Sequence, residues 1–182
     1  MLLAALTCLI VGVSDGDTLT ARCPTQDVQR PYQQVRIRLA EIDAPESGQP
    51  FGKRSKEHLS GLCYQAEAVI RPTTMDRYGR TVARVECKGV DANLEMVKAG
   101  LAWAFTKYQT DPAFPEAELH ARAHRVGMWA EPGHVPPWDF RHTPQQLVAD
   151  ADGCYTGKRG GRFRLMPDGR RRYGCQSRML DL

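Results

Sequence analysis

The stretch QVRIRLAEIDAPE, residues 34–46, decides the fold that we expect for this chain. Its apolar residues alternate with Arg36 and Arg38, so that the two kinds of side chain point to opposite faces of an extended backbone. This period of two predicts a half-buried strand with arginines on its exposed face. Pro45 then disfavours helix at the residue before it and predicts an extended turn at the end of the strand.

Working outward, four further segments follow a strand pattern and three follow a helix pattern. The expected strands are Leu9–Val13, Leu19–Arg22, Gln34–Ala40, Ala66–Arg71 and Thr81–Glu86. The expected helices are Phe51–Leu62, Asp91–Lys98 and Pro115–Val126. The polar loop Pro72–Arg80 joins the last two strands. This order indicates an α+β fold, and the five-stranded OB barrel is the natural candidate because its face binds oligonucleotides.

Length and charge distribution suggest one domain plus an appendage. The chain has 182 residues, with 42% hydrophobic and 25% charged residues, which excludes wholesale disorder. We expect a signal-peptide remnant at residues 1–7, an OB-fold domain at 8–141, a linker at 142–153 and a basic tail at 154–182. Eight of the Lys and Arg residues lie after position 150 against three acids, so the basic excess lies in the tail.

The sequence of the tail predicts a basic β-hairpin, with strands at Arg162-Phe163-Arg164-Leu165 and Arg170-Arg171-Arg172-Tyr173 and a turn at Pro167-Asp168-Gly169. Lysine and arginine give sequence-independent affinity for phosphates, so nucleic-acid binding is one interpretation. Solubility or association with the cell envelope is an equally valid one.

Six cysteines fall in three local pairs, which proximity assigns as Cys8–Cys23, Cys63–Cys87 and Cys154–Cys175. The spacing Cys-x-x-Cys of zinc and redox sites does not occur. The alternative is a set of buried free thiols in a cytosolic protein. We favour disulfides and an oxidising compartment.

The N-terminus is apolar but shorter than the roughly 20 residues that a membrane span needs. Two interpretations remain, the stub of a truncated signal peptide or a first strand that follows a misplaced start codon, and we expect both to apply in part. Residues 1–6 resemble the end of a signal-peptide core, and Thr7 onward is typical of mature protein. We therefore expect a secreted or periplasmic protein with a truncated signal peptide, and a monomer.

Three short polar segments carry the candidate chemistry: Asp15-Gly16-Asp17-Thr18, the turn Arg38 to Glu46, and Asp76-Arg77-Tyr78-Gly79-Arg80. Phosphodiester cleavage needs a hard cation held by carboxylate and carbonyl oxygens, and a carboxylate that positions or deprotonates water. It also needs guanidinium groups that offset charge on the phosphoryl oxygens. The segments supply Asp17 and Asp43 for metal, Glu46 for water, and Arg38 and Arg80 for phosphate.

Together these segments resemble the staphylococcal nuclease (thermonuclease) family, whose motifs they follow in order. The resemblance continues through Asn93-Leu94-Glu95-Met96-Val97, Gly100-Leu101-Ala102 and Gly127-Met128-Trp129, and covers roughly residues 11–141. It implies an OB-fold barrel with three helices. It also implies a hydrolase, a calcium-dependent endonuclease that acts on DNA and RNA, single-stranded preferred, and leaves 3′-phosphate and 5′-hydroxyl ends.

The resemblance also implies the ligands of one calcium ion. Asp17 and Asp43 would ligate through their side chains, and Ala44 through its backbone carbonyl. Glu46 would hold or activate the water. Ala44 stands where the staphylococcal enzyme has threonine, a mild change if only the carbonyl ligates the metal.

The same resemblance assigns substrate contacts. Arg38 and Arg80 would bind the scissile phosphate, and Tyr78 would line the nucleotide pocket. Residues 106–107 replace a nucleotide-contacting tyrosine of the staphylococcal enzyme, while Tyr108 falls at the next tyrosine of the pattern and is the second expected pocket residue.

Two alternatives accompany this interpretation. The chain could be a non-catalytic nuclease-like module that binds nucleic acid or protein, but such modules lose the acidic ligands or the arginines, and all five are present here. His120 and His124 have a spacing that can bind zinc, yet Arg122 lies between them and no glutamate follows the first, so we expect a solvated pair. The aromatic residues expected in the core or closing the domain are Trp103, Phe105, Trp129 and Trp138.

Overall fold

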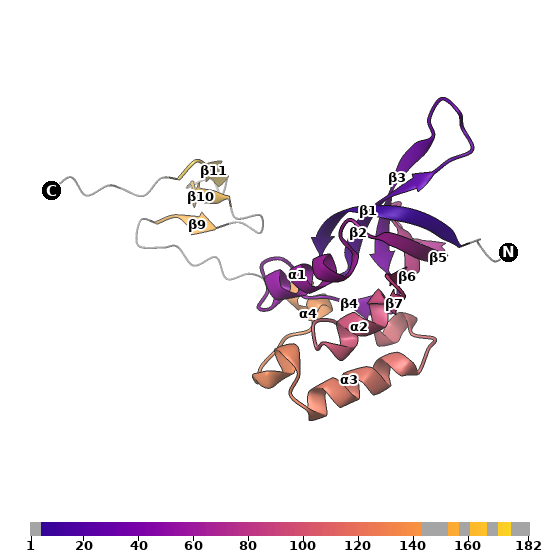
Figure 1. Ribbon diagram of the computed structural model, residues 1–182. Coiled ribbons are helices and arrows are strands. Elements are labelled where there is room, and N and C mark those ends of the chain that lie inside the picture. The colour runs from indigo at the N-terminus through magenta and orange to yellow at the C-terminus, as the bar shows by residue number, and fades with distance from the viewer. Residues whose placement is uncertain (1–4, 143–152, 157–160, 167–170, 176–182) are drawn as a thin grey trace. The chain divides into compact units, whose positions relative to one another are not determined.

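The computed structural model of the chain describes residues 5–142, 153–156, 161–166 and 171–175 (Figure 1). Two compact units divide the chain, Met1–Arg141 and His142–Leu182. Residues 1–4 of the expected signal-peptide remnant and residues 143–152 of the expected linker lie outside the described residues. No helix in the described ranges has the length and apolar character needed to cross a membrane.

A closed barrel of five strands forms the centre of the first unit, which confirms the OB-type fold. Its strands are β1 (Leu6–Asp15), β2 (Thr18–Pro24), β3 (Tyr32–Leu39), β5 (Glu67–Met75) and β6 (Thr81–Cys87). They pair antiparallel in the order β3-β2-β1-β5-β6, and a parallel pairing of β3 with β6 closes the barrel. The short strand β7 (Val90–Asp91) adds to the edge of β6. Closure leaves the backbone groups of the five strands paired around the barrel.

Helices gather at one end of this barrel (Figure 1). They are α1 (Gly52–Cys63), α2 (Ala92–Lys98), α3 (Ala113–Ala123) and α4 (Pro137–His142), with 3₁₀ turns η1 (Thr106–Tyr108) and η2 (Gly127–Ala130). β4 (Ile42–Asp43) pairs with β8 (Trp103–Ala104) beside them. α1 packs on β1, α2 on β6 and α3 on α2. Asp91 caps α2, since its carboxylate accepts from the Leu94 N–H at 3.0 Å.

The core joins the barrel interior to the inner faces of these helices. Strands contribute Ile10, Leu19, Ile37 and Val85, and the helices contribute Leu59, Met96 and Phe114, all fully buried. Each such side chain stabilises the fold by roughly 1.5–3 kcal/mol relative to exposure. This burial holds the turns at the end of the barrel in fixed positions.

All three expected disulfides are present, and the six cysteines leave none free. Cys8–Cys23 crosses from β1 to β2, where the two Cα atoms lie 4.4 Å apart. Cys63–Cys87 ties the end of α1 to β6 with 5.3 Å between Cα atoms. A loop of 15 residues closed in this way contributes about 3 kcal/mol in the chain-entropy account.

Several element boundaries differ from the sequence prediction, and two of the differences are informative. β5 continues to Met75, through part of the expected loop Pro72–Arg80, because a register shift between Pro72 and Thr74 accommodates a residue without an N–H. The third helix begins at Ala113, whose N–H donates to Asp111 Oδ1 (3.0 Å), and ends at Ala123. α4 was not predicted; it starts at a proline, which suits the first position of a helix.

The second unit contains a three-stranded antiparallel sheet, β11-β10-β9. Its strands are β9 (Tyr155–Thr156), β10 (Arg162–Leu165) and β11 (Arg171–Tyr173), which contain the two strands of the expected hairpin. The expected turn at residues 167–169 lies outside the described residues. Phe163 is buried with its ring centroid 5.7 Å from that of Tyr173. The third disulfide, Cys154–Cys175, closes this sheet.

Gly16, in the turn between β1 and β2, lies against α1 and β4. A Cβ atom at this position would overlap the Ser55 hydroxyl and stand 2.8 Å from the Ala44 Cβ. The Ser55 hydroxyl cannot simply rotate away, because it is buried and donates to the Leu101 carbonyl at 2.7 Å. A glycine is therefore required for the turn to approach the helix.

We expect Gly16→Ala to destabilise the fold by about 1–3 kcal/mol, because the added methyl group overpacks this contact. Gly61→Ala is the matched control, since Gly61 lies in α1 with no atom within 4 Å of an added Cβ. That change should stabilise by about 0.5–1 kcal/mol through helix propensity. Urea unfolding of both variants measures the pair, and equal effects of one sign would contradict the packing argument.

Candidate functional site

Two turns at the helical end of the barrel bring the predicted acidic residues together. Asp17 lies in the β1–β2 turn, and its carbonyl accepts the Leu39 N–H at 2.8 Å. The chain leaves β3 and turns through Glu41, whose φ is 65°. It then enters β4, which carries Asp43. The pairing of β2 with β3 thus places residues far apart in the sequence at one point.

Arg38 bridges the two aspartates. Its Nη1 lies 2.7 Å from Asp17 Oδ2, and its Nη2 lies 2.8 Å from Asp43 Oδ1. Nη1 also donates to the Ile42 carbonyl at 3.0 Å. The arginine is itself mostly buried, with 14% of its side chain exposed. The guanidinium therefore compensates both negative charges in a site with little water.

The two carboxylates are buried and held by further hydrogen bonds. Asp43 is fully buried, and Asp17 is nearly so. Asp17 Oδ2 accepts the Ala44 N–H at 2.8 Å, and Oδ1 accepts the Thr18 hydroxyl at 3.0 Å. Burial raises the pKa of Asp43, while the hydrogen bonds from Arg141 and the charge of Arg38 act in the opposite direction.

Asp15 belongs to the same cluster, although we did not include it among the predicted site residues. Its Oδ1 accepts the Asp17 N–H at 3.1 Å. Burial, and then the nearby charge of Asp17, raise its pKa to about 6. The available signal was its place as the first acid of the Asp-Gly-Asp segment, in which only Asp17 was given a role.

Arg141 is the second residue that sequence reasoning missed. It comes from α4, and its guanidinium contacts both Asp43 and Glu46. The Nη1–Glu46 Oε1 distance is 2.7 Å. Burial acts to lower the pKa of Arg141, but its hydrogen bonds to the two carboxylates outweigh this and raise it. No sequence signal pointed to it, since 98 positions separate it from Asp43.

The donor set at this point suits a hard divalent cation. Asp17 and Asp43 offer carboxylate oxygens, which calcium prefers. The strongest indication that this site attracts positive charge is that Asp43 forms ion pairs with two arginines, Arg38 and Arg141. Within the described residues, no three His, Cys, Asp or Glu side chains gather as a metal cluster. A cation here would therefore rely on two carboxylates, with carbonyl and water oxygens completing its shell.

Arg80 lies in a separate loop and is held by its own carboxylate. Its Nε lies 2.7 Å from Asp76 Oδ2, while Asp76 Oδ1 accepts the N–H groups of Tyr78 and Arg80 at 2.9 Å. Because β3 and β6 run parallel with Arg38 opposite Val82, Arg80 lies on the same face as Arg38. Its recorded contacts are with this loop and not with Asp17 or Asp43.

The two predicted pocket tyrosines are both exposed, and they lie in different loops. Tyr78 is 69% exposed, with the guanidinium carbons of Arg77 and Arg80 at 4.9 and 5.7 Å from its ring centroid. Tyr108, in η1, is 62% exposed and packs edge-on against Phe105 at 5.3 Å between centroids. Both rings are exposed enough that a nucleotide base could reach them.

The histidine pair expected to be exposed to solvent is exposed, and the four aromatic residues expected in the core or closing the domain pack against one another. His120 and His124 are exposed and stack on each other at 4.0 Å between centroids. Trp103 is buried and meets Trp129 edge-on, and Phe105 stacks on Trp138. None of these six residues takes part in the acidic cluster.

Comparisons with known proteins agree with this geometry. The model of the family described as staphylococcal nuclease homologue matches residues 36–131. An uncharacterized endonuclease of Haemophilus influenzae is 44% identical over 135 residues, covering 74% of this chain and 72% of that protein. The micrococcal nuclease of Shigella flexneri is 38% identical over 150 residues, covering 76% and 82% respectively. Protein ParB of Escherichia coli is 36% identical over 143 residues, covering 72% and 77%.

The Asp76–Arg80 pair gives a pH-dependent prediction. Burial acts to raise the pKa of Asp76, but hydrogen bonds from Arg80 and Tyr78 outweigh it, so the pKa lies below its ordinary value of 3.8. The pair therefore stabilises the fold at neutral pH, and this contribution is lost as the pH falls below that value. We expect Asp76→Asn to cost about 0.5–1 kcal/mol at pH 7 and almost nothing at about pH 2, by urea unfolding.

Asp27→Asn is the matched control, because the Asp27 carboxylate also accepts a backbone N–H two residues ahead (Gln29, 2.8 Å), while its one arginine contact, the Arg30 N–H at 3.1 Å, is to the backbone carbonyl that the substitution keeps. Its unfolding free energy should change less at pH 7. A cost for Asp76→Asn that stays constant across this pH range would contradict the ion-pair account.

Proposed function

Since this chain is a nuclease that belongs to the staphylococcal nuclease homologue family, we propose that it hydrolyses phosphodiester bonds of DNA and RNA in a calcium-dependent reaction. The observation that carries the proposal is the buried pair Asp17 and Asp43, bridged by Arg38. A solvent-exposed acidic pair would need no such compensation. The burial of Asp17 and Asp43 beside an arginine supports a functional site in which charged groups are kept in an environment of low dielectric constant.

Asp17 and Asp43 would hold the cation, together with the Ala44 carbonyl. When bound, calcium supplies charge that stabilises the phosphoryl oxygens as bonds are broken and formed. The residues themselves do the positioning: the Ala44 N–H on Asp17 Oδ2 and the Thr18 hydroxyl on Oδ1 fix the carboxylate's orientation.

Glu46 would hold or deprotonate the attacking water. It lies at the rim of the cluster, with 39% of its side chain exposed, whereas the two aspartates are buried. Its backbone is fixed by Gln49, whose Oε1 accepts the Glu46 N–H at 3.1 Å. An exposed carboxylate next to a buried cation site can reach both solvent and substrate.

Arg38 and Arg80 would bind the scissile phosphate from two directions. Arg38 rises from within the acidic cluster, and Arg80 approaches from the loop before β6 on the same face of the barrel. A guanidinium stays protonated and offers paired N–H groups that match phosphate geometry. Together they would offset the negative charge that develops in the transition state.

Tyr78 and Tyr108 would contact the nucleotide bases. Stacking on an aromatic ring requires an unpaired base whose face is accessible, which favours single-stranded substrate. Their exposure and their position on separate loops support contacts with bases on either side of the cut.

We also propose that the enzyme is exported. Three disulfides are typical of proteins from oxidising compartments, and here they fasten the barrel, α1 and the basic sheet. An extracellular or periplasmic setting would also supply the calcium that the proposed reaction needs.

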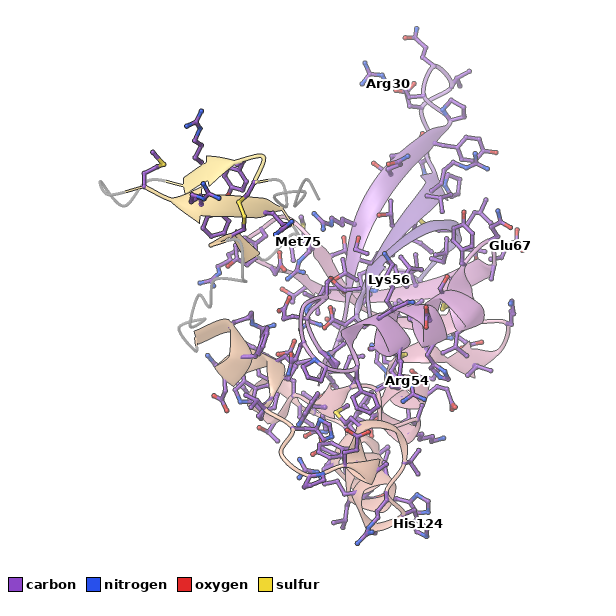
Figure 2. All side chains as sticks on the ribbon, turned by 90° about the vertical axis from the view of Figure 1, so that its left-hand side faces the viewer. Arg30, Arg54, Lys56, Glu67, Met75 and His124 are labelled. Carbon is purple, nitrogen blue, oxygen red and sulfur yellow. A yellow bond between two sulfur atoms is a disulfide. The ribbon has the colours of Figure 1, made fainter. Side chains whose placement is uncertain are left out.

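Digestion of single-stranded DNA tests the proposed roles. We expect wild type to cut with calcium and to stop when calcium is chelated. Glu46→Ala should lower kcat by roughly 10²–10⁴-fold and Arg80→Ala by roughly 10²–10³-fold, because each removes one transition-state contribution. Lys56→Ala, an exposed change on α1, is the control for lost charge (Figure 2).

Equal cutting by wild type and all variants, or cutting that persists in the presence of chelator, would contradict the assigned mechanism. Absence of cutting by any folded form, with binding of DNA retained, would favour the alternative of a non-catalytic nucleic-acid-binding module.

The ends of the products form a separate prediction. In the proposed reaction water bonds to phosphorus, the bond from phosphorus to the 5′ oxygen breaks, and the proton goes to that oxygen. Products should therefore accept a labelled phosphate from polynucleotide kinase without prior phosphatase treatment. Labelling that depends on phosphatase would mean 5′-phosphate ends and contradict this direction of cleavage.

A further inference from the structure

A short segment after the last barrel-associated helix folds back over the acidic cluster. We call residues 134–141 the C-terminal strap. The Val135 carbonyl accepts from Gln49 Nε2 at 2.5 Å. Trp138 stacks on Phe105 with 5.4 Å between ring centroids and 20° between planes. These two contacts anchor the strap to Gln49, shortly after Glu46, and to Phe105, directly after β8, and they bring α4 beside β4 (Figure 1).

Arg141, at the end of this strap, closes around Asp43. Its Nη2 lies 2.5 Å from Asp43 Oδ2, and its Nη1 lies 3.2 Å from Asp43 Oδ1. Arg38 already occupies Oδ1 at 2.8 Å. Both oxygens of this fully buried carboxylate are thus covered by guanidinium groups. The same Arg141 Nη1 also holds Glu46 Oε1 at 2.7 Å.

We propose that Arg141 is a built-in occupant of the cation site, which competes with calcium for Asp43 and restrains Glu46 until calcium displaces it. This inference rests on the proposed calcium-dependent function. It adds a third arginine to the reaction centre, from a segment that lies beyond the matched residues 36–131 of the family.

The competition follows from charge and from space. A calcium ion lies about 2.3–2.6 Å from its ligand oxygens. The oxygens of Asp43 are already approached to comparable distances by Arg141, so both cannot take the same side of the carboxylate. The two positive groups would also repel each other across a site that is largely closed to water. Arg38 differs, because it is held by the Ile42 carbonyl and Asp17 as well.

Displacement requires only a side-chain movement. The anchors of the strap, the Val135 carbonyl and the Trp138 ring, do not involve the Arg141 guanidinium. About 40% of the Arg141 side chain is already exposed, so the guanidinium has a path to solvent. Its departure frees Glu46 at the same moment, which couples calcium loading to release of the water-binding carboxylate.

Calcium binding measured by isothermal titration calorimetry tests this without any nuclease assay. We expect Arg141→Ala to bind calcium roughly five- to tenfold more tightly than wild type, in the range of ordinary site–site couplings. Arg141→Gln, which keeps a hydrogen-bonding side chain but removes the charge, should also bind more tightly. Arg30→Ala is the matched control, because Arg30 is exposed at the tip of the β2–β3 hairpin (Figure 2); its affinity should equal that of wild type.

Thermal unfolding in chelator establishes that each variant is folded, and if Arg141→Ala is not, Arg141→Gln carries the test. Affinities of the folded variants equal to or weaker than wild type would overturn the role of Arg141 alone. Tightening by Arg30→Ala to the same degree would overturn it too, because the effect would then be one of net charge. Absence of calcium binding by every form would overturn the calcium-dependent function itself, and this inference with it.

Discussion

The ion pairs that Arg38 makes with Asp17 and Asp43 are the constraint on which the rest of the site depends. Two buried carboxylates a few ångströms apart repel each other and lose their hydration, a cost that an interior can bear only with opposite charge and hydrogen bonds in place. Arg38 supplies the charge, and the Thr18 hydroxyl and Ala44 N–H supply the hydrogen bonds. The β1–β2 turn and the turn from β3 into β4 are thereby fastened to one guanidinium.

The barrel holds the turns that carry these charged residues in fixed positions, so the ion pairs form without further ordering of the backbone. Asn93, fully buried, donates to the carbonyls of Ala40 and Ala83 and accepts the Val85 N–H, so it links the end of β3 to β6 and α2. Gly16 allows the first turn to lie against α1, where a side chain would not fit. Packing therefore decides the positions of the carboxylates before any ligand arrives.

Arg38 and Arg80, the two arginines proposed to bind the scissile phosphate, are held in different ways. Arg38 is mostly buried, with its contacts inside the acidic cluster, whereas Arg80 is fixed by Asp76 within an exposed loop beside Tyr78. A buried arginine suits a fixed reaction centre, and a loop arginine beside an exposed ring suits contact with a substrate of varying sequence. The site thus combines a rigid centre with an adaptable rim.

Much of this molecule could be predicted from local patterns. Alternation located β3, strand-like patterns located the other four strands of the barrel, the expected helix Asp91–Lys98 corresponds to α2, and proximity paired the cysteines correctly. Local patterns failed in two places. The proline at position 72 predicted the end of a strand, but a bulge lets β5 continue past it. The helix α4 is too short to show a periodic pattern. Ordered motifs identified the acidic and basic residues of the candidate site.

The sequence by itself determined the barrel, the disulfide pairs and the residue types of the site, because those depend on neighbours along the chain and on spacing. Only the tertiary structure decided that Asp15 lies half-buried beside Asp17 and that Arg141 covers Asp43 and Glu46. The burial of Asp15 depends on the surrounding fold, which a turn motif does not record. The contacts of Arg141 join residues more than 90 positions apart, and only the packing of α4 against β4 brings them together.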